Sequence, residues 1–406
     1  MAQEQSSHKP ERYIGLDIHK KYLVAAGVDA EQNQVMPFRK VTWGQFDAWM
    51  EKHLKPGDAV VLEMTTNTWE VYDRLVEHVH SVTVVHPPHV ALITRAQVMN
   101  DKRASLILAT LHAAGLLPGI WVPPQEVRDM RALVAQRHKM VRLATRAKNR
   151  LHAILHRHHL ALPEGSQPFH PKHEDFWLEL PVSEVERTIV QVNWETIVFA
   201  QRQAELLEEC INKAAAQDDR VPLLVQLPGV GTLVAMTVLA AIGDISRFPS
   251  EKKLVGYAGL GARVHDSGQT HRSGRITKRG RKDLRWAMVT AAHHAVRSHP
   301  YWKAYYEWIE PRLGRPKAIV AIARKLLVAV WHVLTEECAD RFADPTKVAC
   351  SLFKHAYRVG VRNLPDDMSA LAFTRYHLDR LGLGRDLTHL PWGSRNFRLP
   401  PSELAG

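Results

Sequence analysis

Short apolar runs alternate with helical stretches between residues 13 and 117, and this alternation restricts the fold more than any other feature of the chain. The segment "YIGLDIHKKYLVAAGVDA" predicts a strand that ends at Asp17, a polar turn and a second strand. The segments "AVVLEMT" and "SVTVVHP" predict two further short, buried strands. Strands separated by helical stretches are typical of α/β sheets. We therefore expect an α/β domain over residues 1–120.

Long helices replace this pattern after "GIWVPP". Between Val127 and His159, apolar residues recur at alternating steps of three and four, which predicts an imperfect coiled coil with a basic exterior. The predicted seam is Met130, Val134, Val141, Ala144, Leu151 and Leu155, interrupted by Arg137 and Lys148. A second long helix between Val182 and Gln217 could pair with it in antiparallel orientation. We assign residues 121–218 to this helical region.

The basic residues of the first long helix are candidate contacts to nucleic acid. They are Arg128, Arg131, Arg137, Lys139, Arg142, Arg146, Lys148 and Arg150, with Arg157 beyond them. Such a row would follow a phosphate backbone. The alternative is an amphipathic helix inside one subunit whose basic face is simply solvated.

A mainly helical third region is expected over residues 219–340 and begins with "LPGVGTLVAMTVLAAIGD". Gly229 and Gly231 form a tight turn before an apolar helix, as in a helix-hairpin-helix that brings backbone N–H groups close to a DNA phosphate. A plain turn between two helices would give the same pattern. The pattern predicts helix through at least Ala339, whereas residues 341–406 indicate only short helices and loops.

The charge balance favours a polyanionic partner. Lys and Arg number 54 against 42 Asp and Glu, which gives a formal net charge of +12. A surplus of this size is typical of nucleic-acid-binding proteins, although it also suits an anionic membrane surface. The N-terminus has no apolar signal core and the chain has no long uninterrupted apolar run, so we expect a cytoplasmic protein of bacterial type that does not enter a membrane. Three widely separated cysteines indicate neither a disulfide framework nor a zinc site.

Two acidic residues occupy predicted buried strands, where an unpaired charge is costly. Asp17 lies in the first strand and Glu63 at the end of "VVLE". If these strands are neighbours, both carboxylates project near one edge, and Asp101 at the start of a helix could complete a magnesium site. The alternatives are acids that cap loops, and an Asn100 or Asp101 that serves only as a helix N-cap.

These acids resemble a known set. Asp17 in "GLDIHK", Glu63 in "LEMTTNTW" and Asp101 in "NDKRAS" are similar, in order and spacing, to the RuvC-like (RNase H-like) domain of IS110/IS1111-type DEDD transposases. The third motif of that family carries two acids three positions apart, on one helix face. Ala104 occupies the fourth position, so either a ligand has been lost or relocated, or the chain is an Asp→Ala variant that stalls catalysis. The resemblance then implies weak metal binding and little strand cleavage.

The segment from residue 259 to 285 carries a basic, glycine-containing loop suited to phosphates. Its basic residues are Arg263, Arg272, Arg275, Lys278, Arg279, Arg281, Lys282 and Arg285. "GLGAR", "DSGQT" and "GRITKRGRKDLR" resemble the C-terminal transposase domain of the same family, with Ala262 replacing its proline. The resemblance implies that Ser267 is the nucleophile, with Ser273 as the alternative. A serine hydroxyl needs an activating neighbour, and His265 or Asp266 could act as its base.

The resemblance implies a DNA recombinase that joins donor and target DNA through phosphoserine links, with Mg²⁺ as cofactor. It further implies a homo-oligomer, dimer or tetramer, joined by the coiled coil, with active sites shared between protomers, and a noncoding bridge RNA as guide. Two other functions remain open. One is a RuvC-like nuclease that uses water, and the other is a nucleic-acid-binding scaffold without catalysis.

Overall fold

The computed structural model describes residues 9–88, 90, 100–165, 167–267 and 270–404, and the side chains of all of these except residues 264–267 and 270–273. The chain forms two compact units, residues 1–123 and 124–406. Each unit has its own hydrophobic core.

A five-stranded mixed sheet forms the centre of the first unit. Its strands are β1 (Arg12–Ile18), β2 (Tyr22–Val28), β3 (Gln34–Thr42), β4 (Asp58–Glu63) and β5 (Ser81–Val85). They lie in the order β3-β2-β1-β4-β5, with β1, β2 and β3 antiparallel and β1, β4 and β5 parallel. The expected α/β domain is therefore confirmed, and the two strands that carry the candidate acids are direct neighbours.

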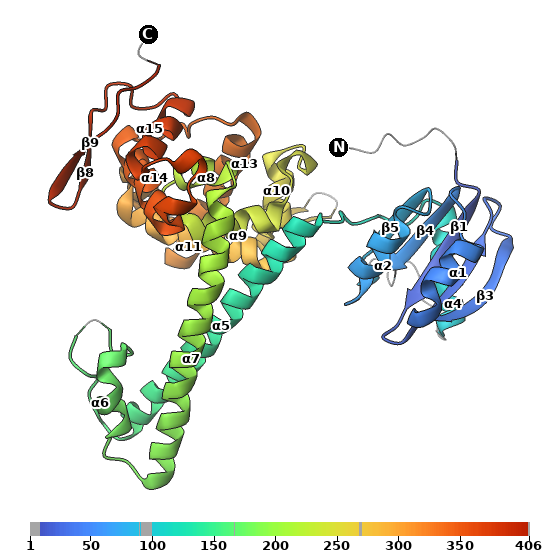
Figure 1. Cartoon of the computed structure of the whole chain (residues 1–406), viewed down its shortest axis with the longest axis horizontal. Helices are drawn as coiled ribbons and strands as arrows, with labels where there is room; N and C mark the ends of the chain where they lie inside the picture. Colours follow the sequence, from blue (N-terminus) through green and yellow to red (C-terminus); the bar gives the residue numbers. More distant parts are fainter. Residues whose placement is uncertain (1–8, 89, 91–99, 166, 268–269, 405–406) are drawn as a thin grey trace. The chain divides into compact units, whose positions relative to one another are not determined.

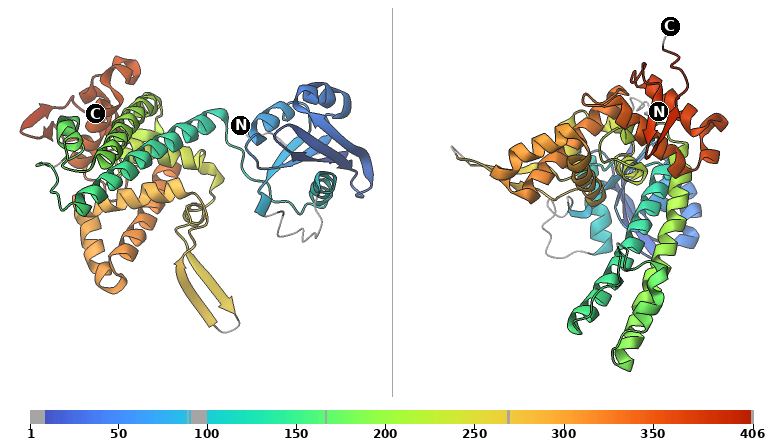
Figure 2. Two further views of the ribbon diagram at one scale, coloured as in Figure 1. Left: turned by 90° about the horizontal axis from the view of Figure 1, so that it is seen from below. Right: turned by 90° about the vertical axis from the view of Figure 1, so that its left-hand side faces the viewer.

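The two faces of this sheet are covered by different helices, because successive side chains of a strand point to opposite faces. Ile14 and Leu16 of β1 are buried in one core with residues of α1 (Phe46–His53) and α2 (Thr68–Leu75). The alternate residues of β1 face α4 (Asp101–Ala113), which packs on β1 and β2. Figure 2 shows α1 and α4 on opposite sides of the sheet. The start of α4 is thus held against the face that carries Asp17.

Two 33-residue helices, α5 (Gln125–Arg157) and α7 (Glu184–Ala216), form an antiparallel hairpin in the second unit (Figure 1). Arg137 pairs with Glu208 near one end, and Arg157 pairs with Glu186 near the other. The predicted seam is only partly correct, because Met130 and Val141 are half-buried. The buried residues of α5 are Val134, His138, Ala144, Ala147, Leu151, Ile154 and Leu155.

A small aromatic core closes the tip of the hairpin. There the chain passes through η2 (Pro171–His173) and α6 (Glu174–Leu178). Trp177 is fully buried, stacks on Phe169 and Trp194, and donates its indole N–H to the carbonyl of Pro168 at 2.8 Å. Buried Trp N–H groups need such a partner. The segment between the two long helices is therefore anchored to them.

The remaining helices pack into one large core. They are α8 (Arg220–Val225), α9 (Thr232–Ile242), α10 (Glu251–Tyr257), α11 (Lys282–Ser298), α12 (Pro300–Leu313), α13 (Arg315–Glu336), α14 (Pro345–Val359) and α15 (Ala370–Arg380), with short 3₁₀ turns η3 (Ile245–Arg247), η4 (Val361–Asn363) and η5 (Pro365–Asp367). Helix α13 alone, among the described residues, is long and apolar enough to cross a membrane. Ile322, Leu326 and Val330 of this helix are buried against the other helices, as expected of a core helix.

Residues 262–276 correct the prediction of a loop in an otherwise helical region. They form a β-hairpin of β6 (Ala262–Ser267) and β7 (Thr270–Ile276). The glycines of this segment disfavour helix, and its β-branched residues favour strands. A second hairpin, β8 (His389–Trp392) and β9 (Arg395–Arg398), follows α15, and Leu390 of β8 is buried in the main core.

Candidate functional site

The sheet register places Asp17 and Glu63 beside each other. Leu16 of β1 pairs with Leu62 of β4 in the parallel ladder, so the next residue of each strand lies at the same level. Both acids follow a buried leucine and therefore point to the other face of the sheet, toward α4. The carboxyl ends of two neighbouring parallel strands thus carry one acid each.

Helix α4 brings a third acid to this edge. Its N-cap is Asn100, whose side-chain oxygen accepts a hydrogen bond from the backbone N–H of Arg103 at 2.9 Å. Because Asn100 performs the capping, Asp101 in the first turn has its carboxylate available for other contacts. Asp101 Oδ2 accepts a hydrogen bond from the hydroxyl of Tyr22 at 2.9 Å.

His19 links two of the acids and was missed by the sequence analysis. Its Nε2 lies 3.2 Å from Asp17 Oδ2 and 3.4 Å from Asp101 Oδ2. One ligand atom from each of these three residues lies within 4.8 Å of the others. The available signal was "DIHK", which places a histidine two residues after the acid, in the turn between β1 and β2.

The electrostatics of this cluster favour a cation. Burial raises the pKa of Asp17, and the Asp101 carboxylate adds to this rise while His19 opposes it. Burial, together with the negative charge of Asp17, also raises the pKa of Glu63. Carboxylates that are crowded and partly desolvated lose this penalty when a positive charge binds between them. The side chains of Asp17 and Asp101 are 22% and 40% exposed, so a hydrated cation can reach them. The donor set fits a hard divalent ion.

The positions of Glu63 and Ala104 limit how well the site fits a divalent cation. Glu63 shares the sheet face but lies outside the group formed by Asp17, His19 and Asp101. Ala104 follows Asp101 by three residues, on the same face of α4, and is half-buried. Its methyl group offers no ligand atom, so the helix contributes one carboxylate to this edge.

The β6–β7 hairpin carries the predicted serine loop. Its backbone register pairs Ser267 with Thr270, His265 with Arg272, and Val264 with Ser273. The side chains of the serine candidates, of the possible bases and of Arg272 lie outside the described part of the chain. Among the flanking basic residues, Arg263, Arg275, Lys278, Arg279 and Lys282 are exposed. Arg281 pairs with Asp283, and Arg285 donates to the carbonyl of Ala258 at 2.8 Å.

The two glycines of the predicted helix-hairpin-helix have different roles. Gly229 has φ +80°, and a Cβ atom there would lie 2.2 Å from the carbonyl oxygen of Ala291 in α11. Its position therefore reflects close packing of the turn on α11. A Cβ atom at Gly231, the N-cap of α9, would meet no described atom within 4 Å. Gly231 is exposed at the start of α9.

Two stretches of the chain match families of known proteins. Residues 14–160 match the DEDD transposase domain of IS110-type elements, and residues 221–307 match the transposase IS116/IS110/IS902 family. The transposase of insertion sequence element IS1111A from Coxiella burnetii is 25% identical over 344 residues, which cover 82% of this chain and 92% of the relative. The chain belongs to the IS110 family of DEDD transposases.

Two further relatives match this IS110-family transposase over most of its length. The pilin gene-inverting protein of Moraxella bovis is 25% identical over 337 residues, covering 80% of this chain and 96% of the relative. A probable family 20 transposase of Pseudomonas aeruginosa is 25% identical over 346 residues, covering 81% and 98%. The family assignment makes the protein a DNA-processing enzyme with DNA as a partner, and DEDD transposases generally use divalent metals.

Arg131 and Arg137, which are predicted nucleic-acid contacts on α5 of this transposase, have internal partners. Arg131 donates to the carbonyls of Ala240 and Ala241 at 2.7 and 2.9 Å, and Arg137 pairs with Glu208. These contacts tie α5 to the C-terminal end of α9 and to α7. Arg128 is half-buried. The exposed cations of the predicted row are Lys139, Arg142, Arg146 and Arg150, the last lying 3.5 Å from the side-chain oxygen of Asn193.

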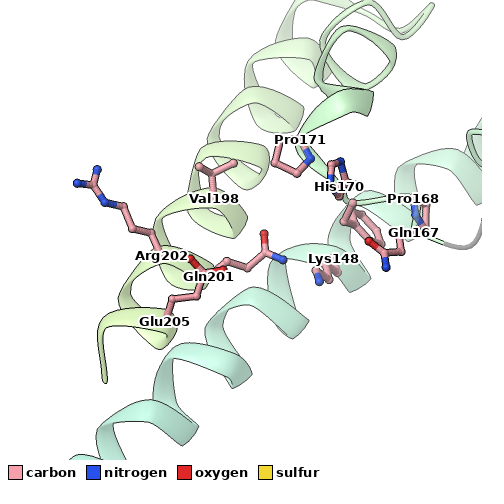
Figure 3. Close-up of a pocket in the computed structure, with 10 residues that line it drawn as sticks. Lys148, Gln167, Pro168, His170, Pro171, Val198, Gln201, Arg202 and Glu205 are labelled. Carbon is pink, nitrogen blue, oxygen red and sulfur yellow. The ribbon is translucent and has the colours of Figure 1, made fainter. Parts of the chain in front are cut away.

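Lys148 faces a hollow near the tip of the α5–α7 hairpin (Figure 3). The hollow has a volume of about 770 Å³ and lies between the two helices and residues 167–171. Lys148 Nζ lies 5.3 Å from the ring centroid of Phe169, and burial lowers the pKa of its ammonium group. Lys148 therefore contributes to the packing of this segment rather than to the exposed basic row.

Proposed function

We propose that this IS110-family transposase cleaves and rejoins DNA through a phosphoserine intermediate at Ser267, with Mg²⁺ at the acidic edge of the sheet. The meeting of Asp17 and Asp101 around His19, beside Glu63, is the observation that carries this proposal. The name of the Moraxella relative, a gene-inverting protein, adds support for strand rejoining over hydrolysis.

The chemistry of this proposal can be written for the residues of the chain. The Ser267 hydroxyl oxygen forms a bond to the scissile phosphorus while a phosphodiester P–O bond breaks, and its proton passes to a neighbouring base. The departing sugar oxygen takes up a proton, and the reverse attack rejoins the strands. Asp17, Glu63 and Asp101 would hold the cation, which supplies neutralisation of phosphate charge. Arg275 and Lys278, exposed beside the hairpin, would stabilise the phosphoryl oxygens.

Ala104 makes this chain a stalled form of the enzyme in our proposal. An acid at this position would lie on the same helix face as Asp101 and could reach the same cation. Its absence removes one negative ligand from the site. We infer weak cation binding and little cleavage, with DNA binding retained.

A structured noncoding RNA is the proposed guide for target choice. Base pairing would then read the sequence, and the protein would bind the backbone. The exposed cations of α5, Lys139, Arg142 and Arg146, supply such a backbone contact.

A second apolar row on α7 supports assembly of identical chains. Val185, Val192, Phe199 and Leu206 recur every seven residues and are 71%, 57%, 55% and 49% exposed. The opposite face of α7 is already buried in the α5–α7 hairpin, where Ile197 is fully covered. A seven-residue repeat is the period of a coiled-coil seam. We propose that this row pairs with the same row of a second copy.

The test is a search for a covalent protein–DNA adduct in the Ala104→Asp background, using the flanking DNA of the element and Mg²⁺. The proposal predicts an adduct that Ser267→Ala abolishes and Ser273→Ala leaves intact. Free 5′-phosphate ends without an adduct would select the hydrolytic nuclease. Binding without cleavage would select the scaffold.

A further inference from the structure

A large groove lies in the second unit, with a volume of about 1410 Å³. Its walls come from α12, α13, the 338–342 segment and the base of β7. The lining residues that matter here are the aromatic Tyr301, Tyr305 and Phe342, and basic residues on α13 and β7. The groove therefore combines aromatic rings with positive charge.

Tyr301, Tyr305 and Phe342 of this groove form a continuous row with Trp308, which lies beyond the lining. The ring of Phe342 stacks on Tyr301 with centroids 3.6 Å apart, and Tyr301 stacks on Tyr305 at 6.3 Å. Tyr305 in turn contacts Trp308 at 5.7 Å, and Trp308 is 70% exposed. Residues 301, 305 and 308 follow the spacing of one helix face, so α12 presents them side by side. The row runs from a half-buried end at Phe342 to an exposed end at Trp308.

Basic side chains line the same groove as this aromatic row. The lining includes Arg275, Lys278, Lys317, Arg324, Lys325 and Arg341, all exposed. None of the six forms a salt bridge with a described carboxylate. Lys325 Nζ lies 4.8 Å from the Tyr305 centroid, and the Arg341 guanidinium lies 4.7 Å from that of Phe342.

The two acids of the groove offset only part of this charge, because six basic side chains line it. Glu336 pairs with His332 at 3.0 Å, and Asp340 is buried, with a carboxylate oxygen 3.1 Å from the backbone N–H of Phe342. Burial also raises the pKa of Asp340. The groove therefore keeps an excess of unpaired positive charge beside its aromatic row.

We propose that this groove binds an unpaired DNA strand, with bases against the aromatic row and phosphates along the cations. Stacking on a row of rings requires bases with free faces, which a duplex does not offer, whereas unpaired cations suit phosphates of any strand. Gly274, Arg275 and Ile276 of β7 line the groove, and β7 pairs with the strand that carries Ser267. The choice of DNA over RNA rests on the proposed function, because the strand leading to the serine would be the one cut.

The experiment measures fluorescence anisotropy of a labelled oligo-dT of about 12 nucleotides with the full chain. An oligo-rU of equal length and a DNA duplex are the parallel arms. The test variant is Tyr301→Ala/Tyr305→Ala, and its matched control is Tyr301→Phe/Tyr305→Phe, which keeps both rings. Tyr357→Ala/Tyr376→Ala removes two exposed tyrosines elsewhere in the unit. A second test variant, Arg324→Ala/Lys325→Ala, alters only exposed side chains and leaves the core intact.

We expect the unsubstituted chain to bind oligo-dT more tightly than oligo-rU. The double alanine variant should bind oligo-dT at least about tenfold more weakly, since each stacked base contributes about five- to a hundredfold. Both tyrosine controls should bind like the unsubstituted chain, and Arg324→Ala/Lys325→Ala should flatten the salt dependence of binding. Unchanged oligo-dT binding by both test variants, or a loss confined to oligo-rU or duplex, would overturn the proposal. Ser267→Ala should leave this binding intact, so failure of the serine mechanism is distinguishable from failure of the groove.

Discussion

Gly15 of β1 and Ser105 of α4 approach so closely that a Cβ atom on Gly15 would lie 2.0 Å from the Ser105 carbonyl oxygen. The same atom would lie 2.7 Å from the backbone nitrogen of Ala109. Helix α4 therefore rests directly on the strand that carries Asp17, two residues further along the same face. This contact holds Asp101, at the start of α4, next to Asp17.

Gly15→Ala should separate Asp101 from Asp17. The obstructing atoms are backbone atoms, so α4 must move, at a cost of about 1–3 kcal/mol in the stability of the first unit. We expect weaker divalent cation binding by calorimetry and a lower unfolding temperature. Gly44→Ala is the matched control, since a Cβ atom there would meet no described atom within 4 Å. Equal effects of the two substitutions would contradict the role given to Gly15.

The metal-free protein should become less stable as pH rises through the raised pKa values of Asp17 and Glu63. An acid whose pKa is higher in the folded state binds more protons when folded, so its contribution is present at low pH and lost as it ionises. Thermal unfolding in a chelator should show this decline. Asp17→Asn should flatten it, and saturating Mg²⁺ should reverse it. A decline that persists in Asp17→Asn would place its origin elsewhere.

Substitution of Arg131 should lower stability, whereas substitution of Arg142 should weaken nucleic-acid binding. Arg131→Met leaves the carbonyls of Ala240 and Ala241 without their charged donor, and should lower the free energy of unfolding by about 1.5–3 kcal/mol. Arg142→Met alters an exposed side chain and should change stability by less than about 0.5 kcal/mol. It should instead reduce the salt dependence of nucleic-acid binding by about one phosphate contact. A loss of stability in Arg142→Met, with weakened nucleic-acid binding but normal stability in Arg131→Met, would contradict this prediction.

The apolar row on α7 should control assembly. Val192→Glu and Phe199→Glu place charge in the proposed seam, so light scattering should show the mass falling from a multiple of 46.1 kDa to that of one chain. Val35→Glu is the control, because Val35 is an exposed valine in the other unit. An unchanged assembly in both seam variants would rule out this row as the interface.

Local pattern was sufficient to predict β1, β2, β4 and β5 of the first unit, because apolar runs of strand length leave few alternatives. It missed β3, in which only Met36 and Val41 are buried. It also identified Asp17 and Glu63 as acids in buried strands, and Asp101 as an acid at the start of a helix. It could not assign His19 a role, because that role depends on α4, whose first residue is 82 positions away in the chain. Arg131 likewise donates to a carbonyl 109 residues away in the chain. The basic pattern of α5 therefore could not distinguish the arginines that bond within the protein from those that are exposed. Contacts between residues so far apart in the chain produce no periodic pattern in the sequence.

The most direct test of the central claim compares Mg²⁺-dependent strand cleavage by this chain with that of its Ala104→Asp variant, on the flanking DNA of the element. The account predicts cleavage by the variant and little or none by this chain, because only the variant supplies a fourth carboxylate on the Asp101 face of α4. Equal cleavage by both proteins would show that the ligand comes from elsewhere and that Ala104 does not stall the site.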